Sequence, residues 1–373
     1  MHLSFSRTSR VLVLAATALL LVGATAGPAS AQLQLGLQDD ALLTSGEPQA
    51  WPLVQQLGPK VIRFNVAMEQ VAPTQPTNQD DPSDPAYDFS RVDEMARQAA
   101  LNGTELLISI VNGAAWANGN RAPAFAPDPA SYGRFCGVVA TRYSGSFTPL
   151  GQTDPLPQVV KYTVGNEPNR AQYFMPQGPN GATAAKNFAN LVKTCVPAIK
   201  TASPSAIVAP GPIASRRDKV SGGSAPLAFL KLYKKAGGPA PEVLAYNPYL
   251  DGLLPQFRPK EKLADGGITL RNLDQLERWL KKAYGRTVPL WFTEFAWRTA
   301  VVKKLGNVTP ARQAALTKQT VQLIRRHYPY AQLLVWFLLR DVSPTSYWKS
   351  GLVTYDWQQK PAFAIYRSLA AQP

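Results

Sequence analysis

Two glutamates stand at the ends of apolar runs, where carboxylates are uncommon. Glu167 follows the strand-forming run 159–164, and Pro168 after it prevents a helix from continuing. Glu294 stands near the end of the run 288–297, which is also apolar. A carboxylate in apolar surroundings is costly unless it is paired or used. One such glutamate could belong to a structural ion pair, but two at equivalent strand ends indicate chemistry that needs a proton donor and a second carboxylate.

These glutamates belong to a regular alternation of strands and helices. Eight apolar segments favour strands, and most are followed by segments whose apolar residues have helical spacing. The strand segments are 33–37, 60–66, 105–112, 159–164, 206–211, 242–249, 288–297 and 331–337. The helical segments are 51–57, 88–96, 129–143, 182–201, 273–284, 310–328 and 361–370. We therefore predict an α/β fold, a single (β/α)8 TIM barrel over residues 32–373, with both glutamates at the carboxyl-terminal rim where catalytic side chains collect.

Histidine and cysteine usage argues against several other chemistries. Of the two histidines, His2 lies at the amino terminus, and His327 lies at a predicted helix end where a cation suits the helix dipole. The sequence has no CxxC pair and no zinc-ligand spacing. This pattern argues against a Ser-His-Asp triad, a Cys-His pair and a His-rich metal site. We expect carboxylate chemistry with no metal and no cofactor.

Residues 1–31 have the features of a secretory signal peptide. Arg7 and Arg10 precede the apolar run 11–26, and the small residues at 29–31 form a cleavage pattern. The run is too short to span a membrane comfortably, and no later run reaches the roughly 18 to 20 apolar residues that a membrane helix needs. We expect a mature chain from Gln32 that is secreted, extracellular or associated with the cell wall, without stable membrane insertion.

The two cysteines, Cys136 and Cys195, lie in the predicted third and fourth outer helices. An exported protein with an even number of cysteines can form disulfides, and these two helices are neighbours in a barrel. A disulfide and two free thiols both stay open, and we predict the disulfide.

The chain is basic, with a formal net charge of +15. A basic exported protein can meet an acidic polysaccharide, nucleic acid or an anionic wall or membrane surface. Most basic residues come as scattered pairs, which is typical of solvated helix faces and loops. No basic stripe interleaved with aromatic residues is present, so we expect no nucleic-acid partner.

Several landmarks in chain order form a recognisable pattern. They are Arg63 at the end of strand two, Asn166-Glu167-Pro168 at the end of strand four, Glu294 at the end of strand seven and Trp336 in strand eight. The chain thereby resembles the retaining (β/α)8-barrel glycoside hydrolases of clan A, which include cellulases, mannanases and β-xylosidases. The resemblance implies a glycosidase that acts on a polysaccharide or oligosaccharide, with Glu167 as the general acid/base and Glu294 as the nucleophile.

The resemblance also implies how the sugar is bound. Arg63 would lie near the nucleophile, Asn166 would hydrogen-bond the sugar 2-hydroxyl, and Tyr249 would touch the nucleophile. Trp336 would stack on the sugar ring. The chain departs from the pattern at strand six, where Asn247 stands in place of the His of many members. Asn has no ionisable proton, so any tuning role of that His does not carry over.

The residue types agree with this chemistry by themselves. Glycoside cleavage needs one carboxyl to protonate the leaving oxygen and one to stabilise or attack the anomeric carbon, and neither metal nor histidine. Sugars have flat faces and polar edges, so aromatic and amide side chains at strand ends are binding candidates, although a single aromatic more often packs in the core. The remaining candidates of this kind are Asn65, Asn112, Trp116, Tyr173 and Trp297.

Two other hypotheses stay open. A non-catalytic barrel could bind an anionic cell-surface polysaccharide through its charge, but it leaves Glu167 and Glu294 without a role. A transglycosylating barrel would pass the sugar to another sugar instead of water. For both hydrolysis and transglycosylation, strands four and seven face each other across the barrel. The carboxyls of Glu167 and Glu294 should therefore lie ~5 Å apart, as in retaining enzymes. We expect a monomer.

Overall fold

The computed structural model describes residues 1–2, 32–217, 222–299, 307–346 and 348–372. Residues 3–31, which form all of the predicted signal peptide except its first two residues, lie outside the described part. The described residues from Gln32 onward belong to one compact unit. None of the helices in the described ranges is both long and apolar enough to cross a membrane.

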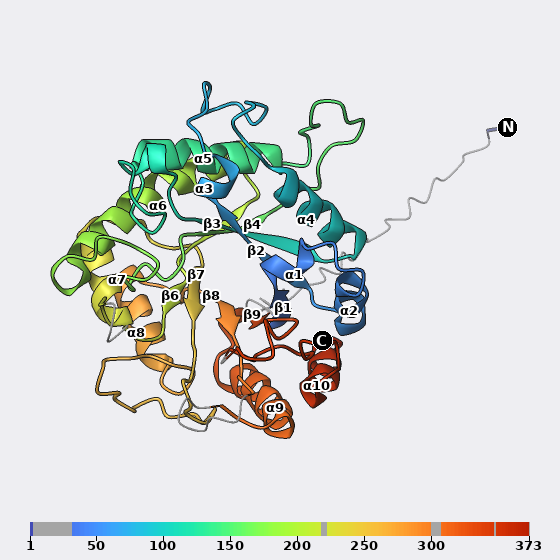
Figure 1. Ribbon diagram of the computed structural model, residues 1–373, viewed down its shortest axis with the longest axis vertical. Helices are drawn as coiled ribbons and strands as arrows, with labels where there is room; N and C mark the ends of the chain where they lie inside the picture. The colour runs from blue at the N-terminus through green and yellow to red at the C-terminus, as the bar shows by residue number, and fades with distance from the viewer. Residues whose placement is uncertain (3–31, 218–221, 300–306, 347, 373) are drawn as a thin grey trace. The chain divides into compact units, whose positions relative to one another are not determined.

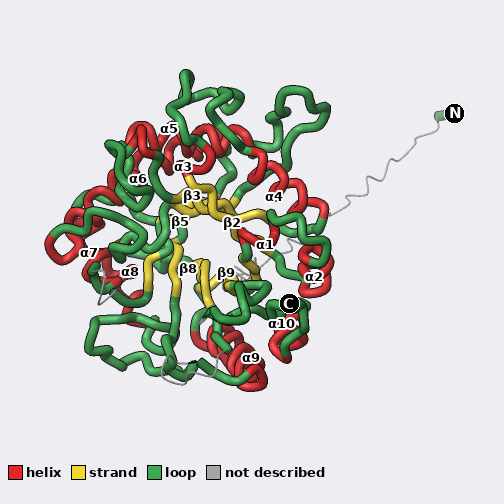
Figure 2. The backbone as a smooth tube through the Cα atoms, in the orientation of Figure 1, coloured by secondary structure: helices red, strands yellow, loops and turns green. Residues whose placement is uncertain are grey.

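Within the described ranges, nine parallel strands form one curled sheet, which Figure 1 shows together with the helices. The strands are β1 (Gln34–Gln38), β2 (Val61–Ala67), β3 (Glu105–Val111), β4 (Lys161–Val164), β5 (Ile207–Pro210), β6 (Ile213–Ala214), β7 (Leu244–Asn247), β8 (Leu290–Phe295) and β9 (Ala331–Phe337). Their order is β5-β4-β3-β2-β1-β9-β8-β7-β6. Figure 2 shows the strands around a central axis with the helices outside them.

The two strands at the ends of this order, β5 and β6, are consecutive in the chain. Only Gly211 and Pro212 separate them, which divides the predicted fifth strand at 206–211. The N–H of Gly211 donates to the carbonyl of Val164 in β4 at 3.1 Å. On its other side, a Cβ at Gly211 would lie 2.6 Å from the carbonyl oxygen of Ala245 in β7. The backbone at Gly211, with φ of +103°, therefore lies between β4 and β7, and glycine meets both the conformation and the close approach.

The helices cover the outer face of the sheet. They are α1 (Asp40–Leu43), α2 (Ala50–Leu57), α3 (Met68–Val71), α4 (Ser90–Leu101), α5 (Pro129–Arg142), α6 (Ala182–Ala202), α7 (Pro226–Lys235), α8 (Asp274–Tyr284), α9 (Pro310–His327) and α10 (Pro361–Ala370), with short 3-10 turns at Ala115–Ala117 and Pro179–Gly181. Helix α7 does not correspond to any of the helical segments predicted from the sequence. Its first residue, Pro226, is of a type that often indicates a loop in a sequence, but proline is also favoured at the first position of a helix.

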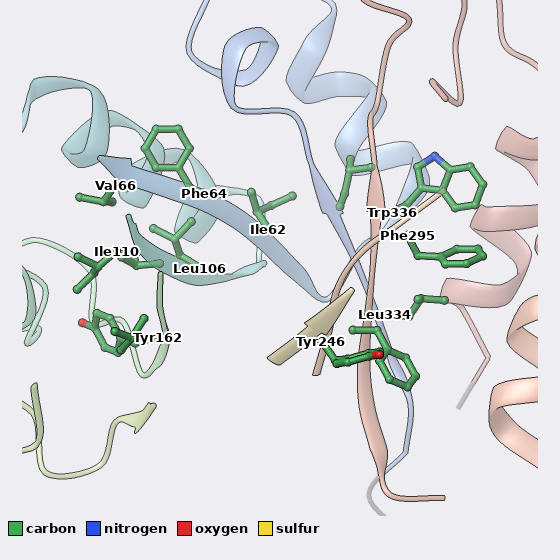
Figure 3. Packing of buried hydrophobic residues seen from close by; sticks show 14 of the residues in the cluster. Ile62, Phe64, Val66, Leu106, Ile110, Tyr162, Tyr246, Phe295, Leu334 and Trp336 are labelled. Atoms are coloured by element: carbon green, nitrogen blue, oxygen red, sulfur yellow. The ribbon is translucent and has the colours of Figure 1, made fainter. Parts of the chain in front are cut away.

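Side chains pack in two layers because they alternate along each strand. The larger layer lies between the sheet and the helices, and Figure 3 shows part of it around Ile62, Tyr246 and Trp336. The smaller layer is formed by Val61, Leu107, Ala209, Val243, Ala245, Trp291, Leu333 and Val335. The smaller layer fills the inside of the curled sheet, as the side chains of small barrels do. Residues two positions further along these strands therefore point to the same inner side, toward the carboxyl-terminal end.

Helices α5 and α6 are joined by a disulfide between Cys136 and Cys195, whose Cα atoms are 5.3 Å apart. The helices approach closely beside the bond, since a Cβ at Gly133 would lie 2.8 Å from the Cβ of Thr194. Both cysteines are fully buried. The histidine at the end of α9, His327, stacks on the ring of Phe257, with ring centres 4.0 Å apart.

Candidate active site

A cavity of about 640 Å³ lies at the carboxyl-terminal ends of the strands. Both predicted catalytic glutamates face it, together with polar, cationic and aromatic side chains. Its lining consists of Gln38, Asn65, Asn166, Glu167, Arg170, Gln172, Tyr173, Ala214, Ser215, Arg216, Arg217, Tyr249, Asp251, Glu294, Arg298, Phe337 and Trp348. The sequence-predicted residues that meet in this cavity are Asn65, Asn166, Glu167, Tyr173, Tyr249 and Glu294.

The backbone after β4 turns sharply to present Glu167. Gly165 adopts φ of +82° and Glu167 itself φ of +41°, a left-handed conformation that costs energy for a residue with a side chain. The N–H of Glu167 donates to the carbonyl of Pro212 at 2.8 Å, which holds the turn against the β5–β6 junction. Strain of this kind persists only where the surrounding structure enforces it, and it is concentrated at functional sites.

The carboxyl of Glu167 is buried, at 4% exposure, and both of its oxygens are held. Asn247 Nδ2 donates to Oε1 at 2.9 Å, and Arg170 Nη1 donates to Oε2 at 2.9 Å. Burial raises the pKa of Glu167, and the charge of Glu294 raises it further, while Arg170 and the Asn247 hydrogen bond act in the opposite direction. The net direction is upward, which favours the protonated form of this carboxyl more than in an ordinary glutamate.

Glu294 has different surroundings. The register of β8 against β9 shifts between Phe292 and Phe295, and such an irregularity can turn a side chain to another face of the sheet. The fully buried guanidinium of Arg63 forms an ion pair with Oε1 of Glu294. The hydroxyl of Tyr249 lies 3.5 Å from Oε2, at the outer limit of a hydrogen bond. Burial raises the pKa of Tyr249 well above its usual value, so the phenol keeps its proton for this contact.

Arg63 connects most of the predicted polar residues. Its Nη2 donates to Asn65 and to Asn166, each at 3.2 Å, and its Nε donates to Ser109 at 2.8 Å. Its Nη1 also donates to Gln38 at 2.7 Å. A fully buried guanidinium with this many acceptors has a fixed orientation, so it also fixes the two asparagines on either side of it.

Asp40 forms a second polar layer behind Asn65. The side chain of Asn65 donates to Asp40 Oδ2 at 2.7 Å, and burial raises the pKa of Asp40 to about 6. The neighbouring Asp39 caps α1, and burial raises its pKa to about 6 as well. These two carboxyls support the cavity from behind, because neither lines it.

Trp336 was predicted to stack on the sugar, and the structure contradicts this. Its side chain is 2% exposed and its indole N–H donates to the carbonyl of Ser350 at 3.0 Å. It packs beside Phe295 and Leu334 between the sheet and the helices (Figure 3). The next residue, Phe337, lines the cavity instead. Because side chains alternate, a register error of one residue moves the aromatic platform to the opposite face.

Three other predicted binding residues also lie away from the cavity lining. Trp297 is 4% exposed, and its indole N–H donates to Thr320 Oγ1 at 3.1 Å in α9. Trp116 donates to the carbonyl of Ala72 at 2.9 Å, and Asn112 donates to Glu69 at 2.7 Å. These side chains connect loops and helices to one another. The three residues lie near strand ends, as predicted, but their side chains do not line the cavity.

The cavity also contains residues that the sequence analysis did not select. Two of them, Phe337 and Trp348, form an aromatic wall with the predicted Tyr249, in which Trp348 meets Tyr249 and Phe337 edge-on at ring-centre distances of 5.9 and 6.0 Å. Phe337 could have been found from the alternation with Val335 and Leu333. Trp348 follows β9 in a loop without periodicity, so no local pattern indicated its position.

A second cavity of about 540 Å³ lies at the opposite, amino-terminal end of the strands. Lys60 and Lys161 are part of its lining, and no carboxylate is. Within the described ranges no group of three His, Cys, Asp or Glu side chains could hold a metal ion. The paired carboxylates therefore make the 640 Å³ cavity the candidate active site.

Several solved structures that superpose on this chain are glycoside hydrolases. A family 39 glycoside hydrolase from Bacteroides cellulosilyticus superposes with a TM-score of 0.65 at 18% identity, over 92% of this chain and 64% of that one. The chain thus shares the fold of this glycoside hydrolase. A β-xylosidase from Caulobacter crescentus (TM-score 0.61, 17% identity) covers 91% of this chain and 67% of its own. A family 5 enzyme from Streptomyces cattleya, solved with Manβ1-4GlcNAc, gives a TM-score of 0.61 at 13% identity over 92% of this chain and 82% of its own.

The glycoside hydrolase fold confirms the resemblance predicted from the sequence at the level of architecture. No protein-family model matches the chain, and no curated protein matches it in sequence. The chain spans 64% of the family 39 enzyme and 66% of a glucosidase from Croceicoccus marinus.

Proposed function

We propose that the protein is an exported retaining glycosidase that cleaves O-glycosidic bonds of a polysaccharide or oligosaccharide. The proposal rests on the convergence of Glu167 and Glu294 on one cavity with different partners. Glu294 is ion-paired with Arg63, whereas burial raises the pKa of Glu167. Two carboxyls in such different surroundings suit an acid and a nucleophile. We also infer that the curled sheet closes as an eight-stranded barrel, with β5 and β6 together as its fifth strand.

In this mechanism protonated Glu167 gives its proton to the glycosidic oxygen as the bond to the anomeric carbon breaks. Oε2 of Glu294 attacks that carbon, because Oε1 is held by Arg63. The Glu167 carboxylate then takes a proton from water, which displaces Glu294 from the anomeric carbon. Two displacements retain the configuration. Asn247 and the backbone bond to Pro212 keep the Glu167 carboxyl aligned through both steps.

The first test is release of reducing ends from a panel of polysaccharides, followed by variants of each glutamate. Glu294→Ala should abolish turnover of every substrate, because no glycosyl-enzyme can form. Glu167→Ala should spare the first step for aryl glycosides with acidic phenols, whose leaving groups need no proton. Azide should then accelerate breakdown of the intermediate and give a β-glycosyl azide if the natural linkage is β. Glu94→Ala, an exposed change on α4, is the matched control and should keep full activity.

The stereochemistry of the first product decides the retaining assignment. Proton NMR during early turnover should show the same anomer as the substrate, and an inverted anomer would overturn the assignment. Analysis of the products separates transfer to water from transfer to a second sugar. A folded protein that binds polysaccharide but releases no product from any of the panel would favour the non-catalytic hypothesis.

A further inference from the structure

Asp40 lies at the start of α1 and contacts two amide side chains that line the candidate active-site cavity. Asn65 donates to Oδ2 of Asp40 twice, from Nδ2 at 2.7 Å and from its backbone N–H at 3.3 Å. Gln38 donates from Nε2 to Oδ1 at 3.3 Å and to Oδ2 at 3.2 Å. One carboxyl group, which itself lies outside the cavity lining, therefore accepts from both amides.

The other end of each amide faces Arg63. Oε1 of Gln38 accepts from Nη1 at 2.7 Å, and Oδ1 of Asn65 accepts from Nη2 at 3.2 Å. An amide side chain has a donating end and an accepting end, whereas a guanidinium only donates and an ionised carboxylate only accepts. Each amide between Arg63 and Asp40 can therefore satisfy both neighbours in only one of its two orientations.

The two amides hold both terminal nitrogens of the Arg63 guanidinium. Nη1, which donates to Gln38, is also the nitrogen that forms the ion pair with Oε1 of Glu294. Nη2 donates to Asn65. A fully buried guanidinium keeps its orientation only while its acceptors stay in place. The position of Arg63 against Glu294 thus depends on amides whose orientation Asp40 sets.

The ionised form of Asp40 is the form that fits this role, because it accepts on both oxygens and donates on neither. Burial raises the pKa of Asp40 to about 6, while the charge of Arg63 and the hydrogen bonds from Gln38 and Asn65 act in the opposite direction. The carboxyl is therefore mostly ionised at neutral pH.

We propose that Asp40 is a positioning residue for the nucleophile Glu294, which it orients through Gln38, Asn65 and Arg63 without touching the substrate. With both amide oxygens directed at Arg63, the guanidinium holds Oε1 of Glu294 and leaves Oε2 for the anomeric carbon. The reacting atoms must be closely aligned, so a displaced nucleophile slows the first displacement more than it weakens substrate binding. This inference deepens the proposed glycosidase function and rests on it.

The first test is Asp40→Asn in the full-length protein. The change keeps the size of the side chain but puts an N–H donor against the donors of Gln38 and Asn65. The probes are the 2,4-dinitrophenyl β-glucoside, β-xyloside and β-mannoside, and the measurement is the rate of phenol release in the first turnover. For the probe that the wild type cleaves fastest, we expect the saturating rate to fall about tenfold or more and the half-saturating concentration to change less than about threefold. An unchanged saturating rate would overturn the proposal.

Asp84→Asn is the matched control, because it is the same change at another buried carboxyl. Asp84 accepts from the N–H of Asn78 at 2.8 Å and from the N–H of Ala86 at 3.0 Å, between α3 and α4 and outside the cavity lining. Its saturating rate should equal that of the wild type, whatever happens to its unfolding midpoint. An equal loss of rate in Asp40→Asn and Asp84→Asn would assign the effect to general destabilisation and contradict the positioning role.

A double-mutant cycle tests whether Asp40 acts through Arg63. Arg63→Lys removes the forked group that the two amides hold. In that background Asp40→Asn should lower the saturating rate little further, because residues that act on one another have non-additive effects. Fully additive losses would show that Asp40 acts by another route. Unfolding midpoints of the single and double variants confirm that each is folded.

Crystal structures of the wild type and of Asp40→Asn give a readout that needs no substrate. We expect the variant to lose at least one of the contacts from Arg63 to Gln38 and Asn65, with the guanidinium displaced from Oε1 of Glu294. Unchanged contacts of Arg63 in the variant would overturn the positioning role.

The two proposals fail in different experiments. If Glu294→Ala still turns over substrate, or if the wild type cleaves none of the polysaccharides and aryl glycosides, the glycosidase mechanism is wrong, and the crystal structures still decide whether Asp40 positions Arg63. If Glu294→Ala is inactive and Asp40→Asn keeps the wild-type rate, the mechanism stands and the role of Asp40 is wrong.

Discussion

Glu167 is the residue in which structure and chemistry are most closely coupled. Its backbone is strained, both carboxyl oxygens are held, and its proton affinity results from opposing influences. Asn247 also accepts from Thr293 Oγ1 at 3.0 Å, so one amide connects the acid to the strand that carries the nucleophile. The Asn that departs from the family pattern thus orients Glu167 without contributing a titrating group.

Arg170 provides a prediction at this scale. Its positive charge lowers the pKa of Glu167, so Arg170→Gln should raise that pKa further. The alkaline limb of the activity–pH profile, where Glu167 loses its proton, should then move to higher pH. The profile of kcat/KM against pH measures this. Arg217→Gln, a change at an exposed cation that does not contact Glu167, should leave the limb in place, and an equal shift in both variants would contradict the assignment.

At the scale of elements, the start of α1 connects two distant segments. Asp39 accepts from the N–H of Leu42 at 3.3 Å, which caps the helix, and from the N–H of Arg340 at 3.1 Å after β9. Burial outweighs these hydrogen bonds and raises the pKa of Asp39 to about 6. The folded protein therefore binds this proton more tightly than the unfolded chain does.

The sign of the resulting pH dependence follows from linkage. The contribution of Asp39 to stability is fully present below about pH 4 and is lost as pH rises through about 6. Over this window it amounts to about 3 kcal/mol. Asp39→Asn should make the free energy of unfolding decrease less between pH 4 and pH 7 than it does in the wild type. Denaturant unfolding of both proteins at pH 4 and pH 7 tests this. An equal decrease in the free energy of unfolding in the variant and the wild type would show that the carboxyl does not titrate in this range.

The disulfide gives a second prediction for elements. It joins α5 to α6 across a sequence separation of 59 residues, and closing a loop of this length stabilises a protein by about 4 kcal/mol on the chain-entropy model. Replacing Cys136 and Cys195 together by Ala should lower the free energy of unfolding by up to that amount. Reductant should destabilise the wild type and leave the double variant unaffected. Two free thiols in denatured, unreduced protein would contradict the bond.

At the scale of the whole molecule, the signal-peptide pattern of residues 1–31 predicts export with cleavage after Ala31. Amino-terminal sequencing of protein from the culture medium should begin at Gln32. A mature pool that begins at Met1 would rule the signal peptide out, and it would also remove the expected oxidising environment for the disulfide.

The sequence by itself determined the parts of this protein that depend on local pattern. Apolar runs predicted the strands, and polar residues at their ends predicted that Glu167 and Glu294 share a rim. The scarcity of histidine left carboxylates as the reactive groups. Such features are readable because parallel strands in this fold are buried on both faces and all end on the same side.

Only the tertiary structure decided which side chains face the cavity. Trp336 and Phe337 are adjacent, and the alternation along β9 sends one to the helices and the other to the site. Arg170, Arg216 and Arg298 are scattered in the sequence, and the curled sheet brings their loops to one cavity. The face of the sheet on which a side chain lies depends on register, and the convergence of loops depends on contacts between distant segments. A local pattern cannot specify either of them.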